Sequence, residues 1–127
     1  MATLTALTHH DVLELAAPFT RSGRHVDLAQ TARRERRLRF QAVQHAPSTP
    51  GDPALREVLQ LECFDDDLFR LTRLLSDPSG AQARLHVDGA DPAVLLARIE
   101  AVPPQLQFRH AAGVPIALEQ RLEGASG

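Results

Sequence analysis

Residues 82–110 restrict the possible folds of this chain more than any other stretch, because strand, turn and helix signals follow one another there without a gap. Apolar and polar side chains alternate over 82–88, with the period of two that a half-buried strand requires. Asp91 can then accept hydrogen bonds from the first free amides of a helix, and Pro92 at the next position has no amide hydrogen to leave unpaired. The sequence therefore predicts a strand over 82–88 and a helix that begins after Asp91.

This helix must end at Pro103 and Pro104, because proline cannot continue a helix that reaches it from the N-terminal side. Residues 105–110 then alternate again, with Leu106 and Phe108 on one side of the chain. We expect a second strand over 105–110, so that the whole stretch forms a β-α-β unit.

The rest of the chain carries weaker signals of the same two kinds. Thr8 and Asp11 have the spacing of a capping box and predict a short N-terminal helix that ends between Pro18 and Gly23. Four leucines at helical spacing, at positions 68, 71, 74 and 75, follow an acidic start and predict a helix over 67–76. Alternation predicts strands over 24–30, 36–43, 56–64 and 114–122, the first two as a hairpin, with a short helix over 116–122 as the alternative for the last.

Together these elements predict an α+β fold: an antiparallel or mixed sheet of about six strands in the order β-β-β-α-β-α-β-β, with two main helices on one face and a short N-terminal helix. We expect a single domain over 1–123 and a flexible tail over 124–127. The tripeptide His-Val-Asp occurs at 25–27 and again at 86–88, which suggests two related halves over 24–64 and 84–122. Short matches of this kind also arise by chance in a chain rich in Arg and Leu.

Composition excludes several kinds of chemistry. All 14 basic residues are Arg, so no mechanism here rests on a lysine, although the same preference is typical of GC-rich coding sequences. The net charge of −2 provides no general attraction to nucleic acid or to an anionic membrane. The single cysteine forms no disulfide framework, and neither a membrane-spanning stretch nor a signal peptide is recognisable, so we expect a cytoplasmic protein.

Three motifs have both a functional and a structural interpretation. Cys63 falls on the inward side of a predicted strand, so we expect it to be a core residue. The alternative is a catalytic nucleophile, but the acidic residues next to Cys63 would disfavour its thiolate form. The acids at 65–67 could bind Mg²⁺ or Ca²⁺, but they also suit the start of a helix. His9 and His10 point in different directions on a helix and therefore make a poor metal pair. We expect no metal site and no cofactor.

The sharpest site hypothesis comes from the two His-Val-Asp strands, in which the His and the Asp share one face of the sheet. Together with outward arginines they would form a face suited to a phosphorylated or carboxylated ligand. The structural alternative is the solvated side of an antiparallel sheet whose other side carries the helices. The candidate ligand-binding residues are His25, Asp27, Arg37, Arg39, Arg84, His86 and Asp88.

The expected function is a small non-catalytic binding or assembly module that uses an exposed sheet face or edge against a protein partner or against a second copy of itself. An enzyme or anion-binding domain that uses the His/Asp/Arg face is the alternative. A weaker alternative is nucleic-acid binding through the hairpin over Arg33–Arg39, which contains five arginines but also suits a solvated sheet edge.

Overall fold

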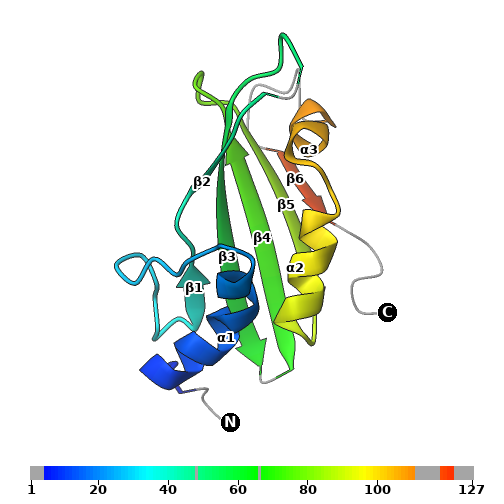
Figure 1. Cartoon of the computed structure of the whole chain (residues 1–127). Coiled ribbons are helices and arrows are strands. Elements are labelled where there is room, and N and C mark those ends of the chain that lie inside the picture. The colour runs from blue at the N-terminus through cyan, green and yellow to red at the C-terminus, as the bar shows by residue number, and fades with distance from the viewer. Residues whose placement is uncertain (1–4, 48, 66, 111–117, 122–127) are drawn as a thin grey trace.

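The computed structural model describes residues 5–47, 49–65, 67–110 and 118–121 and has the predicted α+β class (Figure 1). In chain order the elements are α1 (His9–Arg21), β1 (Arg37–Arg39), β2 (Val43–His45), β3 (Leu55–Asp65), β4 (Leu68–Ser76), β5 (Gln82–Gly89), α2 (Pro92–Glu100), α3 (Pro104–His110) and β6 (Leu118–Arg121). The tail expected over 124–127 lies outside the described residues.

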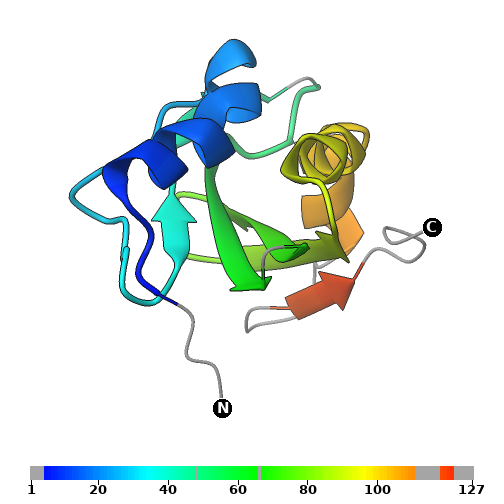
Figure 2. The same cartoon turned by 90° about the horizontal axis from the view of Figure 1, so that it is seen from below.

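One mixed sheet contains all six described strands. Its order is β1-β3-β4-β5-β6, and β2 pairs with β3 as β1 does. Each pair is antiparallel except β5 with β6, which is parallel. Figure 2 shows α1 and α2 on the same side of this sheet, and α3 packs against β5 on that side through the buried Gln107. None of the described helices covers the other side, which we call the helix-free face.

The N-terminal helix forms as predicted and ends within the predicted range. The Thr8 side chain accepts a hydrogen bond from the Asp11 amide at 3.0 Å, and the Asp11 carboxylate accepts one from the Thr8 amide at 2.9 Å. The helix continues past Pro18 to Arg21. With 13 residues α1 is the longest described helix, so the expected ranking of a short N-terminal helix beside two main ones is wrong.

The helix predicted over 67–76 is wrong, because Leu68–Ser76 forms strand β4. The apolar residues there fit a helical spacing and an alternating one about equally well, and a long antiparallel pairing with β3 decides in favour of the strand. The alternation of polar and apolar residues expected of a strand is not visible in the sequence here, because a charged residue, Arg73, occupies an inward position. Its side chain is only 1% exposed, and it has buried partners described below.

The strand predicted over 105–110 is also wrong, because Pro104–His110 forms helix α3. Pro104 begins this helix, as proline often does at a first helical position. The β-α-β unit exists nevertheless, since β6 pairs in parallel with β5 after both α2 and α3. The last predicted strand is thus confirmed over 118–121, and the rest of the predicted range, 114–117 and 122, lies outside the described residues.

The hairpin predicted from 24–30 and 36–43 exists only in reduced form. Val26 and Phe40 form an isolated antiparallel bridge, and Ala32 pairs with Arg37 around a turn in which Arg36 has a positive φ of 57°. The predicted order of elements is therefore corrected to α-β-β-β-β-β-α-α-β. The described parts of 24–64 and 84–122 contain different elements, and the suggested duplication stays a prediction.

The main core lies between the sheet and the helices. Phe19 of α1 stacks on Phe40 at a ring-centroid distance of 4.3 Å, and both side chains are buried. Leucines from neighbouring strands fill the centre, where Leu38, Leu61 and Leu71 are fully buried. Burial of these side chains against the helices fixes which face of the sheet stays open.

Candidate functional site on the helix-free face

Side chains on the helix-free face form rows that cross several strands. Every second residue of β1, β3, β4 and β5 points to this face, and the pairing registers place those residues side by side. Three such rows lie next to each other and differ in charge.

The middle row consists of Arg39, Gln60, Thr72 and His86. Each of these side chains can donate a hydrogen bond, and none carries a carboxylate. Within the described part of the chain, neither the Arg39 guanidinium nor the His86 ring has a hydrogen-bond or ion-pair partner. The middle row is therefore positive and offers donors that the fold itself does not use.

A charge-alternating row lies on one side of it, formed by Arg37, Glu62, Arg70 and Asp88. The Arg70 guanidinium donates two hydrogen bonds to the Asp88 carboxylate, at 2.8 and 3.2 Å. It also lies over the Phe64 ring, 5.5 Å from the centroid. Two cations and two anions balance each other, so this row is neutral as a whole.

An apolar row lies on the other side, where Val58 pairs with Leu74 and Leu74 with Arg84. Val58 is only 5% exposed although no described helix covers it. The three rows together surround a hollow of about 110 Å³. Its lining contains three arginines but one carboxylate, and consists of Arg39, Val58, Gln60, Glu62, Arg70, Thr72, Leu74, Arg84 and His86.

The structure brings together some of the predicted site residues. Arg39, Arg84 and His86 line the hollow, whereas Arg37 and Asp88 lie in the neighbouring charge-alternating row. Five of the seven candidates therefore share the helix-free face.

The other two candidates, His25 and Asp27, lie at the far edge of the sheet. Their segment bridges to Phe40, so β1, β3 and β4 separate it from β5. Four strand spacings amount to about 19 Å along the sheet. The Asp27 carboxylate accepts hydrogen bonds from the amides of Ala29 and Gln30 at 3.2 and 3.3 Å and so stabilises its own turn. The two histidines of the repeated tripeptide thus do not converge on one site.

Sequence reasoning missed a buried ionic cluster on the helix-covered side. Glu57 is 0% exposed, and its carboxylate contacts the guanidinium of Arg24, the His45 ring at 3.2 Å and the Arg73 Nε at 3.5 Å. The inward position of Glu57 on its strand was the available signal, because alternation with Leu59 and Leu61 already implied burial.

Arg73 connects this cluster to the helices. It donates hydrogen bonds to the carbonyl oxygens of Ile99 at 3.1 Å and Val102 at 2.7 Å, and to the Gln107 side chain at 2.7 Å. Burial lowers the pKa of Arg73 to about 10, against the opposing effect of Glu57, so the guanidinium stays charged at neutral pH. Its donors are directed at backbone and side-chain acceptors of the fold, which indicates a structural role.

Two of the arginines in the turn over 33–39 also have structural partners. Arg33 donates through Nε to the Leu7 carbonyl at 2.8 Å, and Arg36 donates through Nη1 to the Thr5 carbonyl at 2.7 Å. These bonds attach the chain before α1 to the turn, so both side chains have a role that needs no ligand.

Cys63 lies in the core as predicted. Its side chain is buried, and burial raises the pKa of the thiol to about 11. The thiolate form needed for nucleophilic attack is therefore scarce at neutral pH.

Among the described residues, no group of three His, Cys, Asp or Glu side chains comes close enough to hold a metal ion. Asp66, the middle acid of the triplet, lies outside those residues. None of the described helices has the length and apolar character needed to cross a membrane.

Fold and site together define an α+β domain with helices on one face and an arginine-rich hollow on the other. Comparisons of the chain with models of protein families, with curated proteins and with solved structures gave no match.

Proposed function

We propose that this protein is a non-catalytic binding module whose helix-free face binds an acidic segment of a partner protein. The observation that carries the proposal is the middle row, Arg39, Gln60, Thr72 and His86, in which four donors lie side by side without a carboxylate.

An anion from outside meets favourable conditions in this row. The Arg39 guanidinium and the His86 ring have no partner among the described side chains, so a carboxylate can bind them without displacing one. The adjacent charge-alternating row is neutral as a whole, and it contributes one carboxylate, Glu62, to the lining of the hollow. Hydrogen bonds to charged groups contribute about 1.5–3 kcal/mol each, so the contribution of each such contact to binding is large enough to measure.

The shape of the hollow favours binding over catalysis. A volume of about 110 Å³ accommodates a carboxylate and a short stem, whereas pockets for small-molecule substrates usually enclose roughly 300–1,000 Å³. The apolar floor of Val58 and Leu74 suits the methylene groups of a glutamate side chain. An enzyme that uses both histidines would need them close together, and a nucleic-acid surface would need the arginines that hold the N-terminal segment. No observation therefore favours these alternatives.

The proposal is tested by NMR titration of the full chain with a short peptide of alternating Glu and Ala, and with its Gln-for-Glu counterpart. We expect the largest amide shifts at Gln60, Thr72 and His86, only with the Glu peptide, and weaker binding at higher salt.

A matched pair of double variants provides the control. Arg39→Gln with His86→Gln should weaken binding at least tenfold, because the row loses the charge of the guanidinium and the N–H donor of the imidazole. Arg34→Gln with His9→Gln makes the same substitutions at exposed positions away from the hollow and should leave affinity within about twofold. Equal losses in both variants, or equal binding of the Gln peptide, would refute the proposal.

A further inference from the structure

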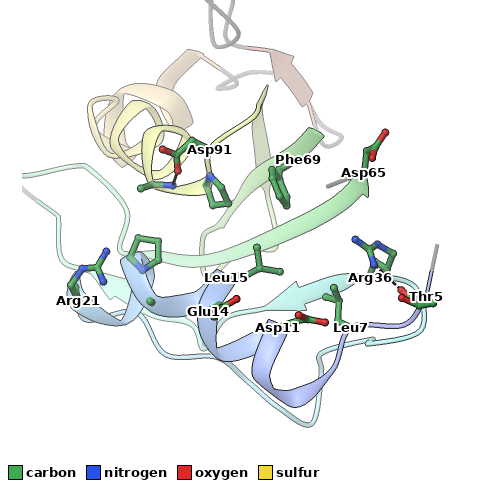
Figure 3. A pocket seen from close by; sticks show the side chains of 14 residues that line it. Thr5, Leu7, Asp11, Glu14, Leu15, Arg21, Arg36, Asp65, Phe69 and Asp91 are labelled. Atoms are coloured by element: carbon green, nitrogen blue, oxygen red, sulfur yellow. Dashed lines mark hydrogen bonds between the residues drawn. The ribbon is translucent and has the colours of Figure 1, made fainter. Parts of the chain in front are cut away.

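A second and larger hollow lies on the helix-covered side, between α1 and the start of α2. This groove has a volume of about 600 Å³. Figure 3 shows it from close by, with Asp11, Glu14, Leu15 and Arg21 of α1 along one side and Asp91 across the groove from them. It is separated from the helix-free face by the sheet itself.

The floor of the groove is apolar. Leu7 and Phe69 are 3% and 6% exposed, and Leu15 packs against the same core cluster. These side chains are held by the core, so the floor exists before any partner binds.

Carboxylates from three different parts of the fold line the groove. Asp11 and Glu14 belong to α1, Asp65 ends β3, and Asp91 precedes α2. Two arginines, Arg21 and Arg36, line it as well, and Arg36 donates to the carbonyl oxygens of Thr5 and Cys63. Four acids against two arginines give the groove the opposite charge to the hollow on the helix-free face.

We propose that the groove docks a basic amphipathic helix of a partner protein. Apolar side chains of that helix would contact Leu7, Leu15 and Phe69, and its Lys or Arg residues would face the acidic rim. Charge complementarity selects this occupant, because an acidic segment would meet four carboxylates of the same sign. The groove is a different surface from the anion-binding hollow, so this inference stands or falls independently of the proposed function.

Binding of synthetic peptides to the full chain tests the inference. The probe is a fluorescently labelled 14-residue helix of Leu and Lys with its leucines on one face. Its two controls are the same helix with Glu in place of Lys and a scrambled Leu/Lys peptide without an apolar face. At physiological salt we expect the amphipathic basic helix to bind at least tenfold more tightly than either control.

Matched variants locate the binding. Glu14→Gln with Asp91→Ser removes two charges from the rim, and serine preserves the capping oxygen that Asp91 gives to the Ala93 amide at 3.0 Å. We expect at least a tenfold loss of affinity. Glu35→Gln with Asp52→Asn removes the same two charges outside the groove and should change affinity by less than about twofold. The double variant Arg39→Gln with His86→Gln, in the hollow of the helix-free face, should also change the affinity for the basic helix by less than about twofold.

Four results would overturn the inference. These are no measurable binding of the basic helix, equal binding of the acidic helix, equal losses in the two acid-to-neutral variants, and concentration-dependent self-association that Glu14→Gln with Asp91→Ser abolishes. The last result would assign the groove to a second copy of this chain.

Discussion

At the scale of single residues, Glu57 and Arg73 decide how the sheet and the helices are joined. Both side chains are almost fully buried and carry opposite charges. Glu57→Gln leaves the guanidinium groups of Arg24 and Arg73 without their shared carboxylate. Because a buried charge that loses its partner costs about 3–5 kcal/mol, we expect the free energy of unfolding to fall by that amount in urea titrations.

The control for this prediction is Glu62→Gln, five residues further along β3 and on the opposite, helix-free face. Glu62 is partly exposed, and its loss should cost less than about 1 kcal/mol. Equal effects of the two substitutions would mean that the buried cluster does not stabilise the fold.

At the scale of elements, the capping box of α1 gives a pH-dependent contribution to stability. The Thr8 amide donates a hydrogen bond to the Asp11 carboxylate, and this bond, together with the contact to the Thr8 side chain, lowers the pKa of Asp11 below the usual 3.8. A lowered pKa means that the charged form stabilises the folded state above pH 3.8 and that this contribution is lost as the pH falls through the folded-state value. Asp11→Asn should therefore destabilise the protein at pH 7 and have a smaller effect near pH 2, as measured by urea unfolding.

Asp67→Asn serves as the comparison for that series, because Asp67 is exposed and makes no cap. It should change stability little at either pH. A loss on Asp11→Asn that is equally large at both pH values would contradict the electrostatic part of the argument.

Elements with a local stop or start signal were predictable from the sequence, and elements fixed by distant partners were not. Thr8 with Asp11 and Asp91 with Pro92 mark their helices within a few residues. Arg73 and Gln107 are residue types expected at the surface. In the structure both are buried, and the Arg73 side chain donates a hydrogen bond to the Gln107 side chain. The sequence pattern therefore predicts a helix where β4 forms and a strand where α3 forms, because a polar residue at a buried position breaks the pattern that distinguishes the two.

At the scale of the whole molecule, the central strands should open last. β3, β4 and β5 are each paired on both sides, whereas β2 pairs only with β3 among the described strands. Amides of Leu61 and Leu71 should exchange with deuterium more slowly than those of Val43 and His45 by at least tenfold. Similar protection of β2 and β4 in hydrogen-exchange NMR would refute this order of stability.

The order of strands in the sheet explains which part of the candidate site could be predicted from the sequence. Alternation alone placed Arg39, Arg84 and His86 on one polar face, because that depends only on neighbours in the chain. It could not show which strands are adjacent, and the repeated His-Val-Asp suggested a pair of histidines that the strand order keeps apart. Identical tripeptides carry no information on strand order.

The row of Arg39, Gln60, Thr72 and His86 has a consequence for recognising the same site in other proteins. Its members come from four strands and have no fixed spacing along the chain, so the two hairpin loops between them can grow or shrink while the row survives. A slip of one residue in any of the three pairings would instead replace a donor by a core side chain. A distant protein that shares this surface would therefore share a pairing register and no short motif.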